Sequence, residues 1–154
     1  TGVDAIAQNT CGGNIAQLLS ALDEAGSCPK TILYSLNPSD NAQLGTLIGC
    51  FQDSSIPGKI QHGSAWWFND TKSGMEEQMK SLANLGLLGN FIGMLTDSRS
   101  FSSYVRFDFF RRILADHLGN FVKKGEYDLY AAISTAKSIC YGNIKNTIIK
   151  EALK

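Results

Sequence analysis

Apolar positions in the first third of the chain follow two different spacings. They first recur at i, i+3, i+4 and i+7, which predicts a helix over residues 13–25 with one apolar face. The next apolar run, residues 31–36, is short and rich in β-favouring side chains. It predicts a buried strand that ends before Pro38, because proline cannot donate to a strand ladder. Helical spacing then resumes behind Ser39 and Asp40, residue types that cap helix N-termini.

The rest of the chain continues this alternation of short apolar runs and longer amphipathic segments. The elements that it predicts are, in order, strand 59–62, an aromatic loop 63–70, helix 71–84, strand 91–96, a long helix from Tyr104 or Arg106, and helices 128–139 and 142–153. Strands that alternate with long helices indicate parallel βα units, so the predicted fold class is α/β. Three strands are too few for a closed eight-stranded barrel of about 250 residues, so any barrel formed here would be incomplete.

Composition and charge narrow the class of protein. The 154 residues are 44% hydrophobic and show no shift in composition, which predicts a single domain over residues 1–154. The chain has 14 basic and 14 acidic residues, so the basic surface of a nucleic-acid-binding protein is not expected. No apolar run reaches the length of about 20 residues that spans a bilayer, and no secretory signal pattern begins the sequence. We therefore expect a soluble, cytoplasmic protein with neither a nucleic-acid nor a membrane partner.

The cysteines are widely spaced and form no C-x-x-C pair. This pattern indicates neither a zinc site nor a dense disulfide framework. We expect buried, reduced thiols at Cys11, Cys28, Cys50 and Cys140.

Chemistry in parallel α/β folds collects at the carboxyl ends of strands. Asp97 directly follows the predicted strand 91–96, where a carboxylate can bind a cation or transfer a proton. Arg99 lies two residues further along. If the backbone stays extended, both side chains point to one side, as a base beside an anion-binding guanidinium. The competing interpretation is an Asp97–Arg99 ion pair or a helix cap at Asp97, and the local sequence alone slightly favours it.

The end of the predicted strand 59–62 and the loop after it carry further candidates. His62 can serve as a metal ligand, an acid or a base, although a lone histidine is more often structural. Trp66 and Trp67 offer a flat surface to the apolar face of a sugar, with core packing as the default interpretation. The arginines on the long helix suggest an anion site, but on a helix such residues more often form a solvated flank, which is the expected interpretation for Arg106, Arg111 and Arg112.

Longer segments of the chain resemble a known family. Residues 31–38 (TILYSLNP), 58–70 (GKIQHGSAWWFND) and 93–101 (GMLTDSRSF), the last followed by 109–114 (FFRRIL), are similar in sequence and order to hallmark segments of the uronate isomerases. The resemblance implies the last three βα units, with C-terminal helices, of a metal-dependent, amidohydrolase-like TIM barrel. It also implies an aldose–ketose isomerase that interconverts D-glucuronate with D-fructuronate and D-galacturonate with D-tagaturonate.

The resemblance further implies roles for individual residues. Asp97 would lie near the metal, as a ligand and as the proton-transfer group of the isomerisation. Arg99 would bind the substrate, with the uronate carboxylate as its expected partner. The loop with Trp66 and Trp67 would shape the sugar pocket, and His62 would lie close to that pocket without an assigned step. The implied cofactor of the complete enzyme is a divalent metal, with zinc as the first expectation.

The chain also departs from the family pattern. The His-x-His pair expected after the first barrel strand is absent, as are the first five strands, so we do not expect these residues to complete a metal site. After the DSRSF segment the chain continues SSYVRF, over residues 102–107, where family members usually continue Leu-Ser-Tyr and a positively charged or histidine-containing stretch. Polar contacts made by that stretch are therefore expected to differ.

Two main hypotheses follow. In the first, the chain is part of a uronate isomerase, is inactive alone, and has a uronate and the missing N-terminal part as its partners. In the second, it is a non-catalytic module that forms homo-oligomers or binds a uronate without turnover, because a small parallel sheet leaves open edges. Hydrolase chemistry, which related barrels perform, is a third and less favoured possibility.

Overall fold

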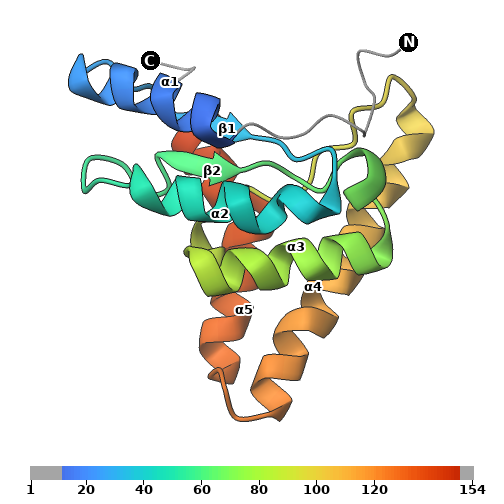
Figure 1. Ribbon diagram of the computed structural model, residues 1–154. Coiled ribbons are helices and arrows are strands. Elements are labelled where there is room, and N and C mark those ends of the chain that lie inside the picture. The colour runs from blue at the N-terminus through green and yellow to red at the C-terminus, as the bar shows by residue number, and fades with distance from the viewer. Residues whose placement is uncertain (1–11, 150–154) are drawn as a thin grey trace.

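Residues 12–149 are described by the computed structural model, which is mostly helical around a small parallel sheet (Figure 1). The helices and strands are, in chain order, α1 (Gly12–Glu24), β1 (Thr31–Leu33), α2 (Asn41–Cys50), β2 (Ile60–His62), α3 (Lys72–Leu85), α4 (Val105–Lys123) and α5 (Leu129–Lys137). The helices predicted from apolar spacing as far as α4 are confirmed, with ends displaced by only a residue or so. Short 3-10 turns fill several of the connections, and π-helical turns follow α5.

The sheet consists of β1 and β2, which run parallel and are connected through α2. Thr31 lies opposite Ile60, and Leu33 lies opposite His62. β2 is buried along its whole length, whereas β1 is only half-buried. The predicted strand 31–36 is shorter than expected. Its last ladder bond runs from the Gly63 N–H to the Leu33 carbonyl at 2.7 Å, after which the chain leaves the sheet.

The predicted strand over residues 91–96 is wrong, because the sheet of the described chain contains only β1 and β2. Gly93 has a φ of 81°, which breaks the pleat in the middle of the segment. A Cβ added to Gly93 would meet the carbonyl oxygen of Ile139 at 2.6 Å, so the backbone here lies directly against the C-terminal turns. The carbonyl of Phe91 accepts a hydrogen bond from the Asn143 side chain at 2.7 Å. A side chain thus takes the place of a neighbouring strand.

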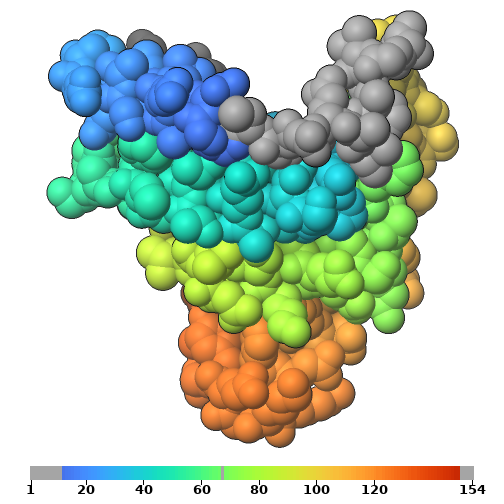
Figure 2. Space-filling view, viewed as in Figure 1, coloured from blue at the N-terminus to red at the C-terminus, as the bar shows by residue number. Residues whose placement is uncertain are grey.

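Successive helices pack on one another along the chain, and Figure 2 shows them as stacked bands. α1, α2 and β2 share a small core of Leu19, Ile48 and Ile60. α3 packs on both α2 and α4, and the pair α4 and α5 extends away from the sheet (Figure 1). The larger core lies where α3, α4 and α5 meet, and its buried side chains include Met75, Met79, Leu82, Phe91, Phe110, Ile113, Leu114, Leu118, Ala132 and Ile139.

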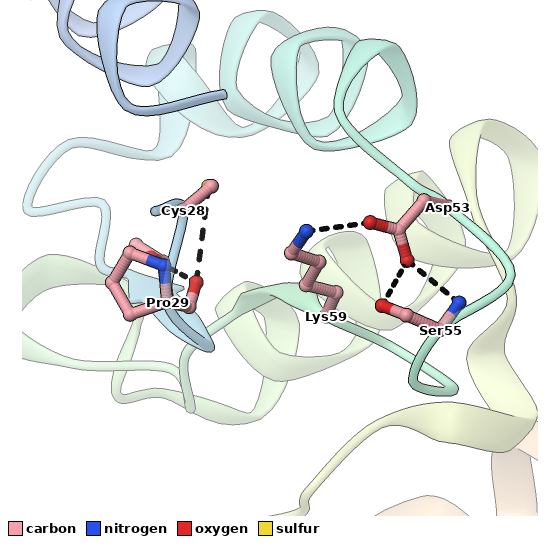
Figure 3. A network of polar contacts seen from close by, with 6 residues as sticks. Cys28, Pro29, Asp53, Ser55 and Lys59 are labelled. Carbon is pink, nitrogen blue, oxygen red and sulfur yellow. Dashed lines mark hydrogen bonds and ion pairs between the residues drawn. The ribbon is translucent and has the colours of Figure 1, made fainter. Parts of the chain in front are cut away.

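A polar network closes the loop between α2 and β2 (Figure 3). The Asp53 carboxylate binds Lys59 Nζ at 2.5 Å and accepts the Ser55 N–H at 2.8 Å. Lys59, and after it Ser55, lower the pKa of Asp53 to about 2. The carboxylate therefore remains charged at neutral pH and fixes Lys59, the residue that leads into β2.

The cysteines of the described chain are free thiols, as predicted. The expected burial is wrong for Cys50 and Cys140, which are exposed, and Cys28 is half-buried. Cys50 lies on the last turn of α2, beyond the residues that face β2, so its position leaves it outside the core. Cys11 lies outside the described residues.

The C-terminal helices are only partly as predicted. The predicted helix 128–139 corresponds to α5, and the Asp128 side chain caps it by accepting the Ala131 N–H at 2.9 Å. The described residues of the predicted helix 142–153 are all helical: Gly142 ends the π-helical turn Ser138–Gly142, residues 143–144 are α-helical, and Lys145–Ile149 form a second π-helical turn. Residues 150–153 lie outside the described chain. None of the helices that the structure describes combines the length and the apolar character needed to cross a membrane.

Candidate active site

Side chains from separate segments meet beyond the carboxyl ends of β1 and β2. Tyr34 follows β1, Trp66 lies in the loop after β2, and Asp97 follows the irregular segment 91–96. The indole N–H of Trp66 donates to Asp97 Oδ2 at 2.9 Å. The rings of Tyr34 and Trp66 meet edge to face, with their centroids 6.0 Å apart. The structure therefore brings together two of the predicted site residues, at the sheet edge where α/β enzymes place their chemistry.

Asp97 has a left-handed backbone, with a φ of 48°. This conformation costs most residues other than glycine about 1–3 kcal/mol, and although aspartate adopts it more readily than most, such strain is concentrated at functional sites. The extended geometry that would have placed Asp97 and Arg99 on one side is therefore absent. The competing structural interpretation also fails: no ion pair joins these two residues in the described chain, and the turn before α4 is entered at Ser100. Both Asp97 and Arg99 are exposed.

Of the two tryptophans predicted to line a sugar pocket, only Trp66 has a side chain that the structure describes. Trp66 is half-buried and is oriented by its bond to Asp97, so it is not a simple core residue. The side chain of Trp67 lies outside the described part of the structure, and its place in a sugar pocket stays a prediction.

Arg106 does not belong to the solvated flank that the sequence predicts. Its guanidinium forms an ion pair with Asp70, and its Nη1 donates to the carbonyl of Thr96 at 2.8 Å. Arg112 does fit the predicted flank, since it is exposed and binds Asp108, one helical turn away, at 2.8 Å. Helical position alone could not distinguish the two arginines, because both partners of Arg106 come from loops.

His62 is buried, with 1% of its surface exposed. Its Nε2 lies 3.1 Å from Ser35 Oγ. Because Ser35 donates its one hydroxyl proton to Asn41 Oδ1 at 2.6 Å, the hydrogen-bond pattern assigns the Nε2–H tautomer to His62. Burial lowers the pKa of His62 to about 4, so the imidazole is neutral at pH 7. Its Nδ1 has no hydrogen-bond partner in the described structure, and its predicted place near a sugar pocket stays a prediction.

Sequence reasoning missed the polar side chains that hold the Trp66 loop in place. Asn69, which is completely buried, donates from Nδ2 to the Ser35 carbonyl at 3.1 Å and accepts from Asn41 Nδ2 at 3.1 Å. These bonds join the end of β1, the start of α2 and the loop after β2. Asparagine and serine are typical of turns, so nothing in the sequence indicated their burial.

Tyr34 was also missed, because a tyrosine inside an apolar run is typical of a core strand. Burial raises the pKa of Tyr34, the nearby Ser64 side chain lowers it, and the charge of Asp97 raises it again, which leaves the pKa above its ordinary value. The phenol stays protonated at neutral pH and can donate a hydrogen bond. A Cβ at Gly63 would overlap the Tyr34 ring, so glycine is needed at this position.

Asp97 can supply one ligand to a divalent cation, since such cations accept carboxylate oxygens. Across residues 12–149, however, no three His, Cys, Asp or Glu side chains are arranged to hold a metal ion. Asp97 could therefore supply one ligand to a metal ion, and the described residues do not form a complete metal site. Any further ligands would come from outside the described residues.

Comparison with known proteins agrees with the resemblance seen in the sequence. The family model described as "Glucuronate isomerase" matches residues 1–148. The uronate isomerase of Lachnospira eligens is 59% identical over 93% of this chain and 31% of its own length. The uronate isomerase of Bacillus licheniformis is 55% identical over 100% of this chain and 34% of its own length.

A solved structure is similar as well. The crystal structure of uronate isomerase from Thermotoga maritima matches with a TM-score of 0.79 at 33% sequence identity, and the match covers 89% of this chain and 29% of that chain. The chain thus spans about a third of the length of the curated relatives it matches. Because the family model covers nearly the whole sequence, the chain belongs to the glucuronate isomerase family.

Proposed function

We propose that this chain carries one part of the active site of a uronate isomerase, which converts D-glucuronate to D-fructuronate and D-galacturonate to D-tagaturonate. The observation that carries the proposal is the hydrogen bond from Trp66 to Asp97, which joins two of the segments that resemble the family. A carboxylate with one oxygen held at 2.9 Å by an indole N–H has a defined orientation toward a sugar bound beside it.

Asp97 is the proton-transfer group in this proposal. An aldose–ketose shift moves protons between neighbouring carbon and oxygen atoms, so it needs a group that accepts a proton and returns it. Asp97 is exposed at the carboxyl edge of the sheet, so a substrate can reach it. Its strained backbone is consistent with a position selected for chemistry rather than for stability.

The remaining site residues bind the substrate in this proposal. Arg99 is exposed close to Asp97 in the sequence, and its guanidinium suits a bidentate contact with the uronate carboxylate. Trp66 and Trp67 form the aromatic wall for the apolar face of the sugar. His62 supports the pocket from its buried position next to Ser35, and we assign it no proton-transfer step.

A divalent metal, with zinc as the first candidate, would act as a Lewis acid on the sugar oxygens when bound. Asp97 would be its ligand from this chain. The other ligands would come from residues beyond those described.

The proposed architecture is the last three βα units of an amidohydrolase-like barrel, folded as a single domain. The described chain forms two of these strands, β1 and β2, and residues 91–96 follow α3 without forming a strand. Within residues 12–149 no further strand pairs with the outer edges of β1 and β2, which favours association with the rest of the barrel or with a second copy of the chain. The same edges favour the alternative of a non-catalytic module that oligomerises. We also propose a cytoplasmic location for the protein, as the sequence predicts.

The test is the conversion of D-glucuronate to D-fructuronate by the full-length natural protein, with zinc or manganese added. The native protein should turn over, and Asp97→Asn should reduce kcat roughly 100-fold or more, because it removes the proton-transfer group. Arg112→Gln, which changes an exposed ion pair on α4, is the matched control and should keep native activity. Full activity in Asp97→Asn would refute the proposal. Turnover by residues 1–154 alone would contradict the proposal that this chain carries only part of the active site.

A further inference from the structure

Arg106 contacts both of the segments that build the candidate site. It lies in the first turn of α4, and its guanidinium reaches two loops. One side of the guanidinium pairs with Asp70, which ends the loop that carries Trp66. Nη1 donates to the carbonyl of Thr96 at 2.8 Å, and that carbonyl belongs to the peptide that enters Asp97.

We propose that Arg106 is a positioning residue that clamps these two segments together, so that the indole N–H of Trp66 meets the Asp97 carboxylate. Its effect on turnover rests on the proposed function. Its effect on the Trp66–Asp97 geometry rests only on the contacts described here.

The backbone of Asp97 is the reason that a clamp is needed. Aspartate tolerates a left-handed φ in loops, but the surroundings must still select this conformation over the commoner ones. Arg106 fixes the plane of the Thr96–Asp97 peptide through the carbonyl of Thr96. The other local bond, from the Ser98 N–H to Thr96 Oγ1, is longer at 3.3 Å. Without the guanidinium, the peptide can rotate and turn the Asp97 carboxylate away from Trp66.

The ion pair of Arg106 is less exposed to solvent than that of Arg112, the other arginine of α4 that pairs with a carboxylate among the described residues. The side chains of Arg106 and Asp70 are 31% and 23% exposed, so solvent screens this pair less than a surface pair. Arg112 and Asp108 are 81% and 57% exposed, and the Arg112 side chain binds only along its own helix in the described chain. Because a planar guanidinium presents several donors at fixed angles, one arginine can bind both Asp70 and Thr96, which a lysine cannot do equally well.

The clamp is tested by fluorine NMR of the full-length natural protein labelled with 5-fluorotryptophan. Trp66→Phe identifies the Trp66 signal, and Asp97→Asn gives its position without the carboxylate. We expect Arg106→Gln and Asp70→Asn to move the Trp66 signal toward the Asp97→Asn position. Arg106→Lys should move it less, because the charge next to Asp70 is kept. Arg112→Gln should leave the signal at its native position.

Kinetics give the second measurement. In the isomerase assay, Arg106→Gln and Asp70→Asn should lower kcat roughly 10- to 100-fold with a smaller change in KM, because they displace the proton-transfer group and remove no side chain that is proposed to bind the substrate. A native Trp66 signal in both variants would overturn the proposal even if they melt at lower temperature, since Arg106 would then be only structural. The NMR measurement needs no turnover. An inactive native protein would therefore refute the proposed function, while the clamp would still be decided by the Trp66 signal.

Discussion

Asp97 combines a strained backbone with the carboxylate that the proposed reaction needs. Glycine adopts a φ of 48° freely, whereas the Cβ of alanine opposes it, so Asp97→Gly should be more stable to urea than Asp97→Ala by about 1 kcal/mol. At an ordinary helical position the order is reversed. Ala115→Gly, at an exposed site on α4, should destabilise by about 1 kcal/mol and serves as the control. If Asp97→Ala is the more stable of the Asp97 variants, the left-handed backbone is not maintained in solution.

The burial of His62 predicts a pH-dependent stability. Its pKa falls from an ordinary value of 6.5 to about 4 in the folded protein. Between these values the unfolded chain binds a proton that the folded chain excludes. The free energy of unfolding should therefore decrease from pH 6.5 to pH 4, by up to roughly 3 kcal/mol, and this contribution should be constant above pH 6.5.

Urea unfolding at pH 7 and pH 4.5 measures the effect of His62. His62→Gln keeps a hydrogen-bond donor for Ser35 and cannot titrate, so it should lose less stability between the two pH values than the native protein. Burial also lowers the pKa of His117, and His117→Gln is the control that should leave the His62 contribution in place. If the free energy of unfolding falls equally between pH 7 and pH 4.5 in the native and His62→Gln proteins, the imidazole of His62 takes up a proton equally well in the folded and unfolded states.

The sequence could predict a site residue where its own segment marks it. It could not do so where the role of the residue depends on partners that are distant in the sequence. Asp97 and Trp66 lie in segments that resemble the family, so the resemblance was enough to name them as candidates, although the strand predicted before Asp97 does not form. The roles of Asn69 and Arg106 depend on partners from distant loops, and no local pattern indicates such contacts. The sequence predicted a solvated flank for Arg106 and gave no prediction for the burial of Asn69.

At the scale of elements, the segment 91–96 shows what apolar spacing cannot predict. Its run of apolar residues fits a strand, yet Gly93 adopts a φ of 81° and the segment packs against Ile139 without a ladder. The helices were predicted well because each has an apolar face that packs on the next helix, and this depends only on spacing along the chain. A strand also needs a neighbour of matching register, which its own sequence does not encode.

The close approach at Gly93 gives a prediction for this element. Gly93→Ala should destabilise the protein by more than about 1 kcal/mol, because alanine is strained at positive φ and its Cβ would meet the Ile139 carbonyl. Gly89→Ala is a matched control, since no atom lies within 4 Å of the added Cβ. Thermal melting of Gly93→Ala and Gly89→Ala measures the difference in stability between the two variants. A melting temperature for Gly93→Ala at or above that of Gly89→Ala would show that the segment can move away from Ile139.

At the scale of the whole molecule, the sheet predicts how the chain associates. The Thr31 N–H donates to Lys59 O at 2.9 Å, and Leu33 O accepts from Gly63 N at 2.7 Å, so these residues bond toward β2. Ile32, between them, directs its backbone groups to the opposite edge, because alternate residues of a parallel strand bond to opposite sides. No strand of the described chain covers that edge. We therefore expect residues 1–154 to self-associate, with a mass by light scattering that rises with concentration.

A substitution at Ile32 can test this edge without disturbing the pairing of β1 with β2. Ile32→Pro removes the outward N–H and keeps the bonds of Thr31 and Leu33, so it should reduce the average mass at high concentration. Ile32→Val keeps the donor and the β-favouring shape, and it should associate like the native chain. Circular dichroism should show the same helix content in all three chains, which separates lost association from lost folding. A native chain that stays monomeric at high concentration would show that the free edge of β1 does not drive association.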